Sequence, residues 1–534
     1  MPDAVVIGAG HNGLVAAAML ADAGWSVAVL EAGDVVGGAV RTEELTLPGF
    51  RHDTFSAFYP FAVASPALAA LDLGTHGLAW RRAPLVVAHP TPDGRAVALS
   101  TDLDETAASL DAYAPGDGDS WHRMYRRFER LSRPLFESLL GPFPPVRAGA
   151  RLAAAVGPAE WLRFARFALL PARRLVHEEF AAAGEGAKLL IAGNAAHTDI
   201  GPEMAGSGLF GWILACAGQQ HGFPVPEGGA GQLAAALRRR AEAAGATVTC
   251  GVRVTEVVVR RGRAVAVRTQ DGAEVDARRA VLADVDAPTL FGDLVGAEHL
   301  PPRLLDDLRR RFEWDPATFK VDWALDGPVP WTAEAARRAG TVHVSDSLDE
   351  LSRYFTDLAT GTVPSRPFLL FGQQAVADPS RCPPGSATGW AYTHVPRAAR
   401  FDAAGSEAFA DLIEARIEEL APGFRSLVSA RHLMTPAAFE AVDANLRGGA
   451  VGAGTQQLHQ QLVFRPTAGL GRAGTPVAGL FLAGASAHPG AGVHGACGAN
   501  AARAALAADR LRRVAQLAAR ARRTDSLPPS DRTS

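Results

Sequence analysis

Three glycines near the N-terminus have the spacing of a phosphate-binding turn. Gly8, Gly10 and Gly13 form a GxGxxG sequence directly after an apolar run. In such a turn the first glycine permits a tight bend, the second lets the backbone approach a pyrophosphate, and the third lets the following helix pack on the strand. Glu31 ends the next apolar run, where its carboxylate would accept a hydrogen bond from a ribose 2′-hydroxyl and repel a 2′-phosphate. The pattern predicts a dinucleotide site and disfavours NADP.

A second glycine pair helps to distinguish between NAD and FAD, the two dinucleotides that remain as candidate cofactors. Gly37 and Gly38 follow soon after Glu31, and Arg41 comes next. NAD does not require another close backbone approach at this point, whereas the ribityl chain and flavin of FAD extend beyond the pyrophosphate. FAD is therefore the expected cofactor. Arg41 is either a partner for a phosphate or a flavin carbonyl, or an ordinary surface arginine.

The C-terminal region carries a second candidate cofactor contact. An apolar run, Leu480–Ala483, leads into Gly484, a Gly/Pro-rich loop and a helix predicted from about Gly492. Backbone N–H groups of such a loop can point at the N1/O2 edge of a flavin, where negative charge develops on reduction. Three side chains that could touch substrate or flavin stand in or beside the loop: His488, His494 and Cys497. None of them is assigned a catalytic role.

The elements around these residues indicate an α/β fold. Residues 4–30 are typical of the strand, helix and strand of a βαβ unit. Residues 222–284 predict a helix, alternating strands at 247–250, 252–260, 263–269 and 273–276, and a short parallel-type strand. Val254 sits where the strand backbone could bond an adenine edge. Since both ends of the chain must reach one flavin, the FAD-binding domain is expected to be discontinuous.

We therefore expect a Rossmann-like FAD-binding domain with a β-meander insert, and a mixed α+β substrate domain that contains an antiparallel sheet. The predicted segments are 1–78, 222–290 and 466–515 for the FAD-binding domain, 79–221 (mostly helical) and 291–465 for the substrate domain, and 516–534 for a disordered tail. Residues 318–331 and 387–396 alternate apolar and polar residues, which predicts half-buried strands. Lys320 is expected on the solvated face of the first of these strands.

One segment could contact a membrane surface. Residues 159–176 have an amphipathic helical pattern. Its large apolar side chains gather near one face: Trp161, Phe164, Phe167 and Leu170. A basic amphipathic helix of this kind either packs on the protein core or rests on a membrane.

The composition of the chain restricts its possible binding partners and its cellular compartment. A formal net charge of −3 over 534 residues does not predict nucleic acid as a partner. The four cysteines include no CxxC, which favours a reducing compartment, by default the cytoplasm. No run reaches ~18 uninterrupted apolar residues, so no spanning helix is expected, and no His/Cys cluster has metal-ligand spacing. A small-molecule substrate is the expected partner, and the oligomeric state stays open.

Four ordered motifs resemble those of a known family. They are VVIGAGHNGL, LEAGDVVGGAVRTEEL, GFPVPEGGAGQL and LFLAGASAHPGAGVHGACGANAA. Together they resemble the phytoene-desaturase-like branch of the FAD-dependent amine-oxidase-type flavoproteins. Within it the likeness is to the pyridine nucleotide-disulphide oxidoreductase domain-containing protein 2 group, of which LRGGAVGAGTQQLHQQLVFRP is also characteristic. The resemblance spans residues 4 to about 508.

This resemblance implies a two-domain flavoprotein with non-covalent FAD. By similarity, the ADP and ribityl portions would be bound by Gly8, Gly10, Gly13, Glu31, Gly37 and Gly38. Val254 would meet the adenine, while Gly484 and the turn formed by Gly492 and Val493 would lie by the ribityl chain and flavin ring. Ala39 and His494 stand where carotenoid desaturases usually have arginine and proline, which argues against a carotenoid substrate.

The resulting hypothesis is an FAD-dependent oxidoreductase that removes a hydride from a C–H bond of an apolar or partly apolar small molecule. Oxygen or a quinone would reoxidise the flavin, because a second GxGxxG unit for NAD(P) is not found and the missing CxxC does not support disulphide chemistry. The alternatives are a membrane-associated phytoene-type desaturase, an amine oxidase, and a non-enzymatic lipid- or prenyl-binding protein of the same fold. The complete set of glycines disfavours the last.

Overall fold

The first of two large sheets is a five-stranded parallel sheet that collects strands from the beginning, middle and end of the chain. The computed structural model describes residues 1–525. The strand order is β19–β13–β1–β2–β9. The strands are β1 (Ala4–Ile7), β2 (Val27–Leu30), β9 (Thr247–Thr249), β13 (Ala280–Ala283) and β19 (Leu480–Leu482). Residues 247–249, expected beside the meander, instead pair with β2 as the sheet edge.

The alternation of side chains along β1 divides this sheet into two covered faces. Ala4 and Val6 pack under helices, whereas Val5 and Ile7 pack against the meander. The helices are α1 (His11–Asp22), α11 (Gly231–Ala243) and α17 (Ala496–Asp525), and the meander strands are β10 (Val254–Arg260), β11 (Arg263–Thr269) and β12 (Glu274–Asp276). Because both faces are covered, the four inner and C-terminal strands β1, β2, β13 and β19 are apolar, whereas the edge strand β9 exposes Thr247 and Thr249.

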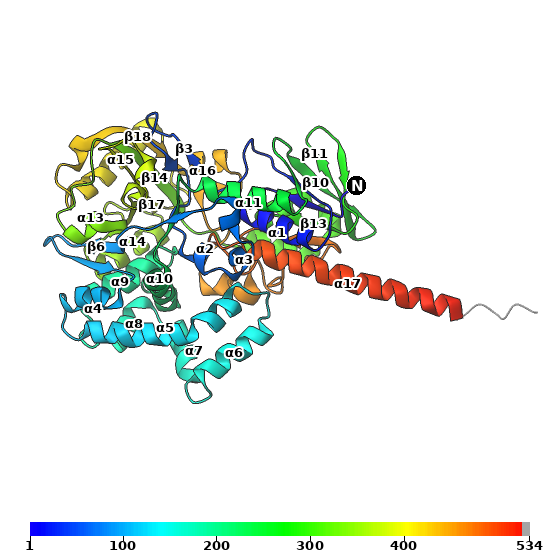
Figure 1. Cartoon of the computed structure of the whole chain (residues 1–534), viewed down its shortest axis with the longest axis horizontal. Helices are drawn as coiled ribbons and strands as arrows, with labels where there is room; N and C mark the ends of the chain where they lie inside the picture. Colours follow the sequence, from blue (N-terminus) through cyan, green and yellow to red (C-terminus); the bar gives the residue numbers. More distant parts are fainter. Residues whose placement is uncertain (526–534) are drawn as a thin grey trace, which may run out of the picture.

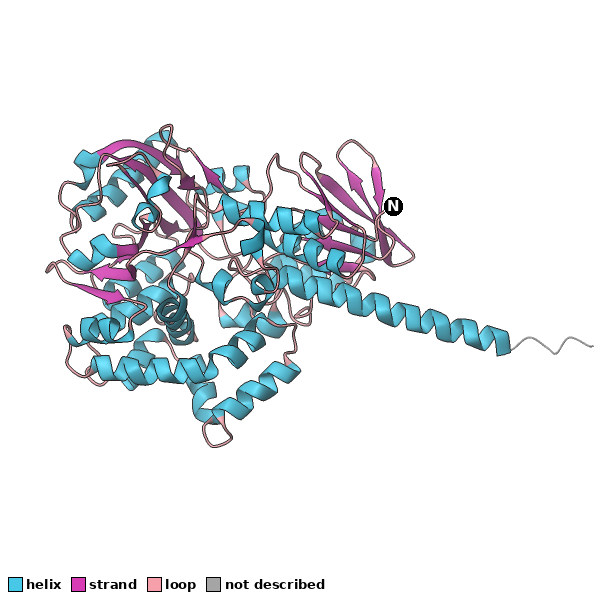
Figure 2. Ribbon diagram, in the orientation of Figure 1, coloured by secondary structure: helices cyan, strands magenta, loops and turns pink. Residues whose placement is uncertain are grey.

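The second sheet has seven strands in the order β18–β14–β17–β16–β15–β6–β7. The strands are β6 (Leu85–Pro90), β7 (Ala96–Leu99), β14 (Ala317–Leu325), β15 (Ala339–Val344), β16 (Leu369–Gly372), β17 (Ala387–Val395) and β18 (Val428–Met434). The sheet is mixed rather than antiparallel, because β15 pairs in parallel with β6. Both β6 and β7 lie in a region expected to be mostly helical. Figure 2 shows this sheet and the meander as separate groups of strands.

Helices cover both faces of the seven-stranded sheet, so β14 and β17 are not half buried as expected, whereas the edge strand β18 is only partly buried. One side packs on α5 (Asp117–Leu140), α9 (Glu185–Ala196), α10 (Ser207–His221) and α14 (Leu348–Ala359), and the other on α13 (Glu334–Arg338) and α15 (Ala403–Glu418). Every residue of β14 is buried, including Lys320 at 1% exposure. The expectation of a solvated lysine was therefore wrong, because a second layer covers the polar face of the strand.

Smaller elements connect the two sheets. They are β3 (Thr42–Glu43), β4 (His52–Asp53), α2 (Pro60–Ala64), α3 (Pro66–Ala69), β5 (Trp80–Arg81), α4 (Leu103–Asp111), α6 (Val146–Val156), α7 (Trp161–Leu169), α8 (Ala172–Glu179), β8 (Val225–Pro226), α12 (Pro302–Arg310) and α16 (Pro436–Val442). Segment 159–176, expected as one helix, is broken at Leu170–Pro171 because proline starts a new helix. Its Phe164 and Phe167 join the core.

The C-terminal helix α17 is longer than expected and projects from the body of the protein (Figure 1). It begins at Ala496 rather than near Gly492, and residues 516–525 are helical rather than disordered. The rest of the predicted tail, 526–534, lies outside the described residues.

The two sheets with their helices confirm the α/β class: a discontinuous Rossmann-like unit with a meander insert, plus a mixed substrate unit. The six segment boundaries stay a prediction.

Candidate functional site

The turn between β1 and α1 has the backbone geometry that its glycines predict. Gly8 adopts φ +89°, which a side chain would strain. A Cβ on Gly13 would lie 2.3 Å from the carbonyl oxygen of Gly8, so only glycine lets α1 approach the strand so closely. Helix α1 starts at Gly10 without a capping side chain. The N–H groups of His11 and Asn12 therefore lack intrahelical partners and can bind an anion, whereas Gly13 N donates to Asp284.

Glu31 anchors this turn from the end of β2. Its Oε2 accepts a hydrogen bond from Ala9 N (2.7 Å), and its Oε1 accepts one from Gly33 N (2.8 Å). Val254 begins β10 and packs in the same core cluster as Ile7 and Leu30, so it lies beneath the carboxyl ends of β1 and β2. The proposed ribose and adenine contacts of these two residues remain predictions.

The second glycine pair lies directly against the first turn. Gly37 N donates a hydrogen bond to Ala9 O (2.8 Å), and Gly37 has φ +117°. A Cβ on Gly37 would lie 2.4 Å from Val40 O, whereas one on Gly38 would lie 3.5 Å from Gly10 Cα. Arg41 is not an ordinary surface arginine, since its side chain is only 17% exposed and its Nε has no hydrogen-bond partner among the described residues.

The C-terminal loop meets the N-terminal turn in space. Gly484 follows β19 and donates a hydrogen bond to Ala283 O (3.2 Å) at the end of β13. Farther along, Gly492 has φ +121°. A Cβ on Gly498 would lie 1.9 Å from Asn12 O, which shows how tightly α17 packs on the start of α1.

These loops and the second sheet enclose one cavity of about 620 Å³. Six of the predicted cofactor positions line it: Gly10, Gly37, Gly38, Gly484, Gly492 and Val493. The other five, Gly8, Gly13, Glu31, Arg41 and Val254, are not part of its lining. The sequence therefore located one end of the cavity, through glycines that lie more than four hundred residues apart.

An acidic residue missed by the sequence analysis lies under the glycine turn. Asp284 follows β13, and its Oδ2 accepts a hydrogen bond from Gly13 N (2.8 Å). Burial, aided by the charges of Glu31 and Asp443 and opposed by the hydrogen bond from Gly13, raises the pKa of Asp284 to about 7. Its place at the carboxyl end of a parallel strand, where ligands bind in α/β folds, was the signal that could have found it.

Lys320 is the second residue that the sequence analysis undervalued. From the middle of β14 it lines the cavity. Its Nζ donates to Asp53 O (2.8 Å) and Thr54 O (3.3 Å), and it pairs with both carboxylate oxygens of Asp322 (2.7 and 2.8 Å). Burial raises the pKa of Asp322 to about 6, although the Lys320 charge opposes the rise. The cavity wall thus carries a fixed cation.

The reactive side chains of the C-terminal loop are held in neutral forms. His488 and His494 line the cavity, as does His11 on α1. Burial lowers the pKa of His11 and His488 to about 4 and that of His494 to about 3. Cys497 is not part of the lining, and burial raises the pKa of its thiol to about 12. None of these groups is a proton donor at neutral pH.

The far part of the cavity is mainly apolar. Its wall on this side includes Phe136, Leu139 and Leu140 from α5, Leu209, Phe210, Ile213 and Leu214 from α10, and Trp390 and Tyr392 from β17. The rings of Trp390 and Tyr392 stack with centroids 5.9 Å apart. A flat, apolar space of this kind suits an apolar small molecule.

The residues present fit FAD. The turn glycines leave room that a Cβ would fill, and the uncapped start of α1 faces the same space. Two buried polar atoms beside the turn, Asn12 Oδ1 and Arg41 Nε, have no hydrogen-bond partner among the described residues. Within residues 1–525 no cluster of His, Cys, Asp and Glu could hold a metal ion, and no helix has the length and apolar character needed to cross a bilayer.

Comparison with known proteins places the chain in a family. Residues 13–506 match the flavin containing amine oxidoreductase family. A pyridine nucleotide-disulfide oxidoreductase domain-containing protein 2 from Mus musculus is 30% identical over 553 residues, covering 94% of this chain and 92% of the relative. A lycopene-forming phytoene desaturase from Pseudescherichia vulneris is 28% identical, covering 93% and 96%.

A solved structure supports the same fold. Putrescine oxidase bound to putrescine superposes with a TM-score of 0.60 at 19% identity, covering 95% of this chain and 98% of that structure. The glycine turns, the cavity and the family match agree with one another. The chain belongs to the flavin containing amine oxidoreductase family and is an FAD-dependent oxidoreductase.

Proposed function

We propose that the protein oxidises an apolar or partly apolar small molecule at a C–H bond, and that oxygen or a quinone is the final electron acceptor. The observation that carries this proposal is the single cavity of about 620 Å³ that joins the glycine turns to the apolar wall of α5 and α10. A cofactor bound by the turns and a substrate held by the apolar wall would then be neighbours.

In this proposal the residues of the chain bind, orient and exclude water. The N–H groups at the start of α1 would hold the pyrophosphate, and the backbone of Gly484, Gly492 and Val493 would lie by the ribityl chain and flavin. The cofactor supplies the hydride-accepting chemistry when bound. Lys320 lines the wall and is held there by its pair with Asp322. No side chain is assigned as a base, so position and a dry cavity are the main contributions of the protein.

The test is anaerobic reduction of the purified protein. We expect a yellow protein with the two-banded visible spectrum of oxidised flavin, which bleaches with one class of a panel of amines, hydroxy acids and polyenes. Admitting oxygen, or adding a quinone without oxygen, identifies the acceptor by return of the colour. A colourless preparation that does not take up added FAD would contradict the proposal and revive a non-enzymatic binding protein.

We also propose that the surface beside α7 rests on a membrane. Trp161 and Leu162 on α7 are 41% and 81% exposed. Leu169 and Leu462 are exposed as well and also line the cavity, so this apolar surface borders the entrance. A peripheral contact there would let a lipophilic substrate pass from the bilayer into the cavity. We further propose a reducing, cytoplasmic setting, which the four free thiols support.

Replacing Trp161 and Leu162 by serine is expected to abolish flotation of the protein with anionic vesicles. The physical reason is the loss of two exposed apolar groups that could enter the headgroup region. Leu511→Ser is the control, because Leu511 is 71% exposed on α17, away from the cavity. Equal flotation of wild type and the double variant, or none for the wild type, would refute the membrane contact.

A further inference from the structure

One carboxylate lies in the mainly apolar part of the cavity. Asp199 lies in the turn between α9 and α10 and lines the cavity, and its side chain is 9% exposed. Its backbone is in the left-handed region at φ 62°, a conformation that aspartate tolerates better than most residues. The turn therefore presents this side chain to the cavity at some cost in backbone strain.

A histidine behind the cavity wall holds one oxygen of this carboxylate. His394 of β17 forms an ion pair with Asp199, with 2.6 Å between Nε2 and Oδ1. Burial lowers the pKa of His394, but the charges of Asp199 and Asp315 outweigh burial and raise it. His394 does not line the cavity, so the pair is oriented with the histidine inside the protein and the carboxylate at the surface of the cavity.

The second oxygen of Asp199 is free to bind a ligand. Among residues 1–525, no group donates a hydrogen bond to Oδ2. Oδ2 is accessible to solvent, whereas Oδ1 is fully buried. A carboxylate oxygen in an apolar space needs a hydrogen-bond donor, because burial without one is costly. Small-molecule cavities commonly use a few such polar groups to orient an apolar ligand.

We propose that Asp199 binds an amine or hydroxyl group of the substrate, so that the cavity selects molecules with a hydrogen-bond donor at one end and an apolar remainder. This inference rests on the proposed function and narrows its substrate class. A hydrocarbon would leave Asp199 Oδ2 without a partner and would bind more weakly for that reason. The alternative is that the Asp199–His394 pair has only a structural role and holds the α9–α10 turn against β17.

The experiment compares three ligands of one size by titration calorimetry on the FAD-loaded protein: octylamine, 1-octanol and methyl heptyl ether. The ether has the same chain and an oxygen but no donor. Since a hydrogen bond to a charged group contributes about 1.5–3 kcal/mol, the amine and the alcohol are expected to bind about 10- to 100-fold more tightly than the ether. Equal affinities for all three would overturn the inference.

Two variants show whether Asp199 causes the preference. Asp199→Ala is expected to bind all three ligands with similar affinity. Asp199→Asn keeps the shape and the fold but not the charge, so the preference for octylamine should fall about 10-fold or more. Asp357→Asn on α14, outside the cavity lining, is the control and should keep the wild-type preference. An Asn variant that binds octylamine as the wild type does would overturn the inference.

The inference and the proposed function can fail separately. Flavin content is measured for each preparation by its absorbance after denaturation. A wild-type protein that neither contains nor takes up flavin refutes the oxidoreductase proposal. The ligand preference is measured by the heat of binding, so it does not depend on a change in flavin colour. A flavin-loaded protein that ignores the donor refutes only the role of Asp199.

Discussion

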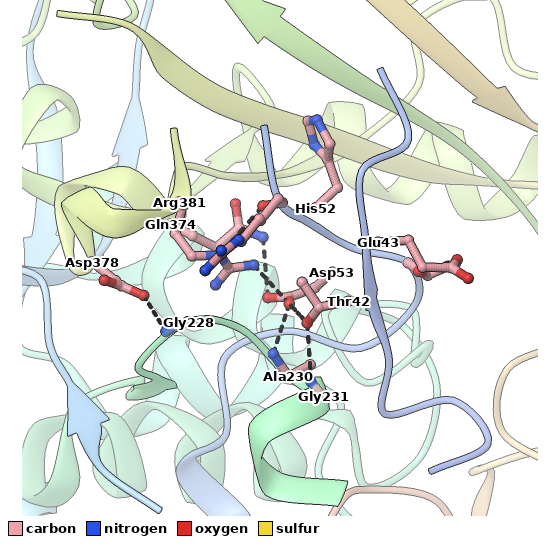
Figure 3. A network of polar contacts seen from close by, with 12 residues as sticks. Thr42, Glu43, His52, Asp53, Gly228, Ala230, Gly231, Gln374, Asp378 and Arg381 are labelled. Atoms are coloured by element: carbon pink, nitrogen blue, oxygen red, sulfur yellow. Dashed lines mark hydrogen bonds and ion pairs between the residues drawn. The ribbon is translucent and has the colours of Figure 1, made fainter. Parts of the chain in front are cut away.

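Replacing Arg381 by methionine is expected to lower the free energy of unfolding by about 3–5 kcal/mol, because it leaves the Asp53 carboxylate buried without its cation. Arg381 and Asp53 are both fully buried, with 2.7 Å between Nη2 and Oδ1. Asp53 Oδ1 also accepts hydrogen bonds from Thr42 Oγ1 (2.8 Å) and Ala230 N (2.8 Å), as Figure 3 shows. The Asp53 carboxylate thus links the two glycine-rich segments that contain Thr42 and Ala230 to Arg381. Arg381 lies in the connection between β16 and β17 of the seven-stranded sheet.

Chemical denaturation at neutral pH measures this change in the free energy of unfolding. Two further variants show whether the unpaired charge causes it. The double variant Asp53→Asn with Arg381→Met should recover part of the loss, since no unpaired charge stays inside. Arg81→Met is the matched control: it breaks an exposed ion pair with Glu227 (2.7 Å), which solvent screens and which should contribute little to stability. If Arg381→Met costs no more than Arg81→Met, the buried network does not stabilise the fold as argued.

The second large effect is expected at the glycine turn. Gly13→Ala would bring a Cβ to 2.3 Å from Gly8 O and 3.1 Å from Asp284 Oδ2. Neither neighbour can move freely, because one is turn backbone held by a hydrogen bond from Gly8 N to Leu30 O and the other accepts a hydrogen bond from Gly13 N. The start of α1 must therefore shift away from the turn. Overpacking of this kind costs about 1–3 kcal/mol, so the dissociation constant of FAD should rise about 5- to 150-fold.

Fluorescence titration of the apoprotein with FAD measures that constant. The control is Gly149→Ala in α6, where a new Cβ meets nothing within 4 Å and no positive φ is required. It should leave FAD affinity unchanged and favour the helix slightly. Wild-type affinity in Gly13→Ala would show that the cofactor does not depend on the close approach of α1 and β1.

The sequence by itself determined the parts of this protein whose geometry is local. Gly8 needs a left-handed backbone and Gly13 a close contact, and both demands arise within one short turn, so spacing alone predicts them. The same holds for Glu31, which lies at the end of an adjacent apolar strand. The α/β class and the meeting of the two glycine-rich loops follow, because one elongated cofactor must touch both.

Only the tertiary structure decided which polar residues are buried. Alternation along β14 assigns Lys320 and Asp322 to one face, but it does not show that helices and β4 cover that face. Asp199 is likewise an ordinary turn residue until β17 brings His394 to it from almost two hundred positions away. Strand β6 was missed for a related reason, since its parallel partner β15 is remote in the chain. Strand β7 pairs only with the adjacent β6, and the sequence analysis overlooked this local hairpin. Burial and pairing depend on segments far apart in sequence, and a local pattern carries no information about what will pack against it.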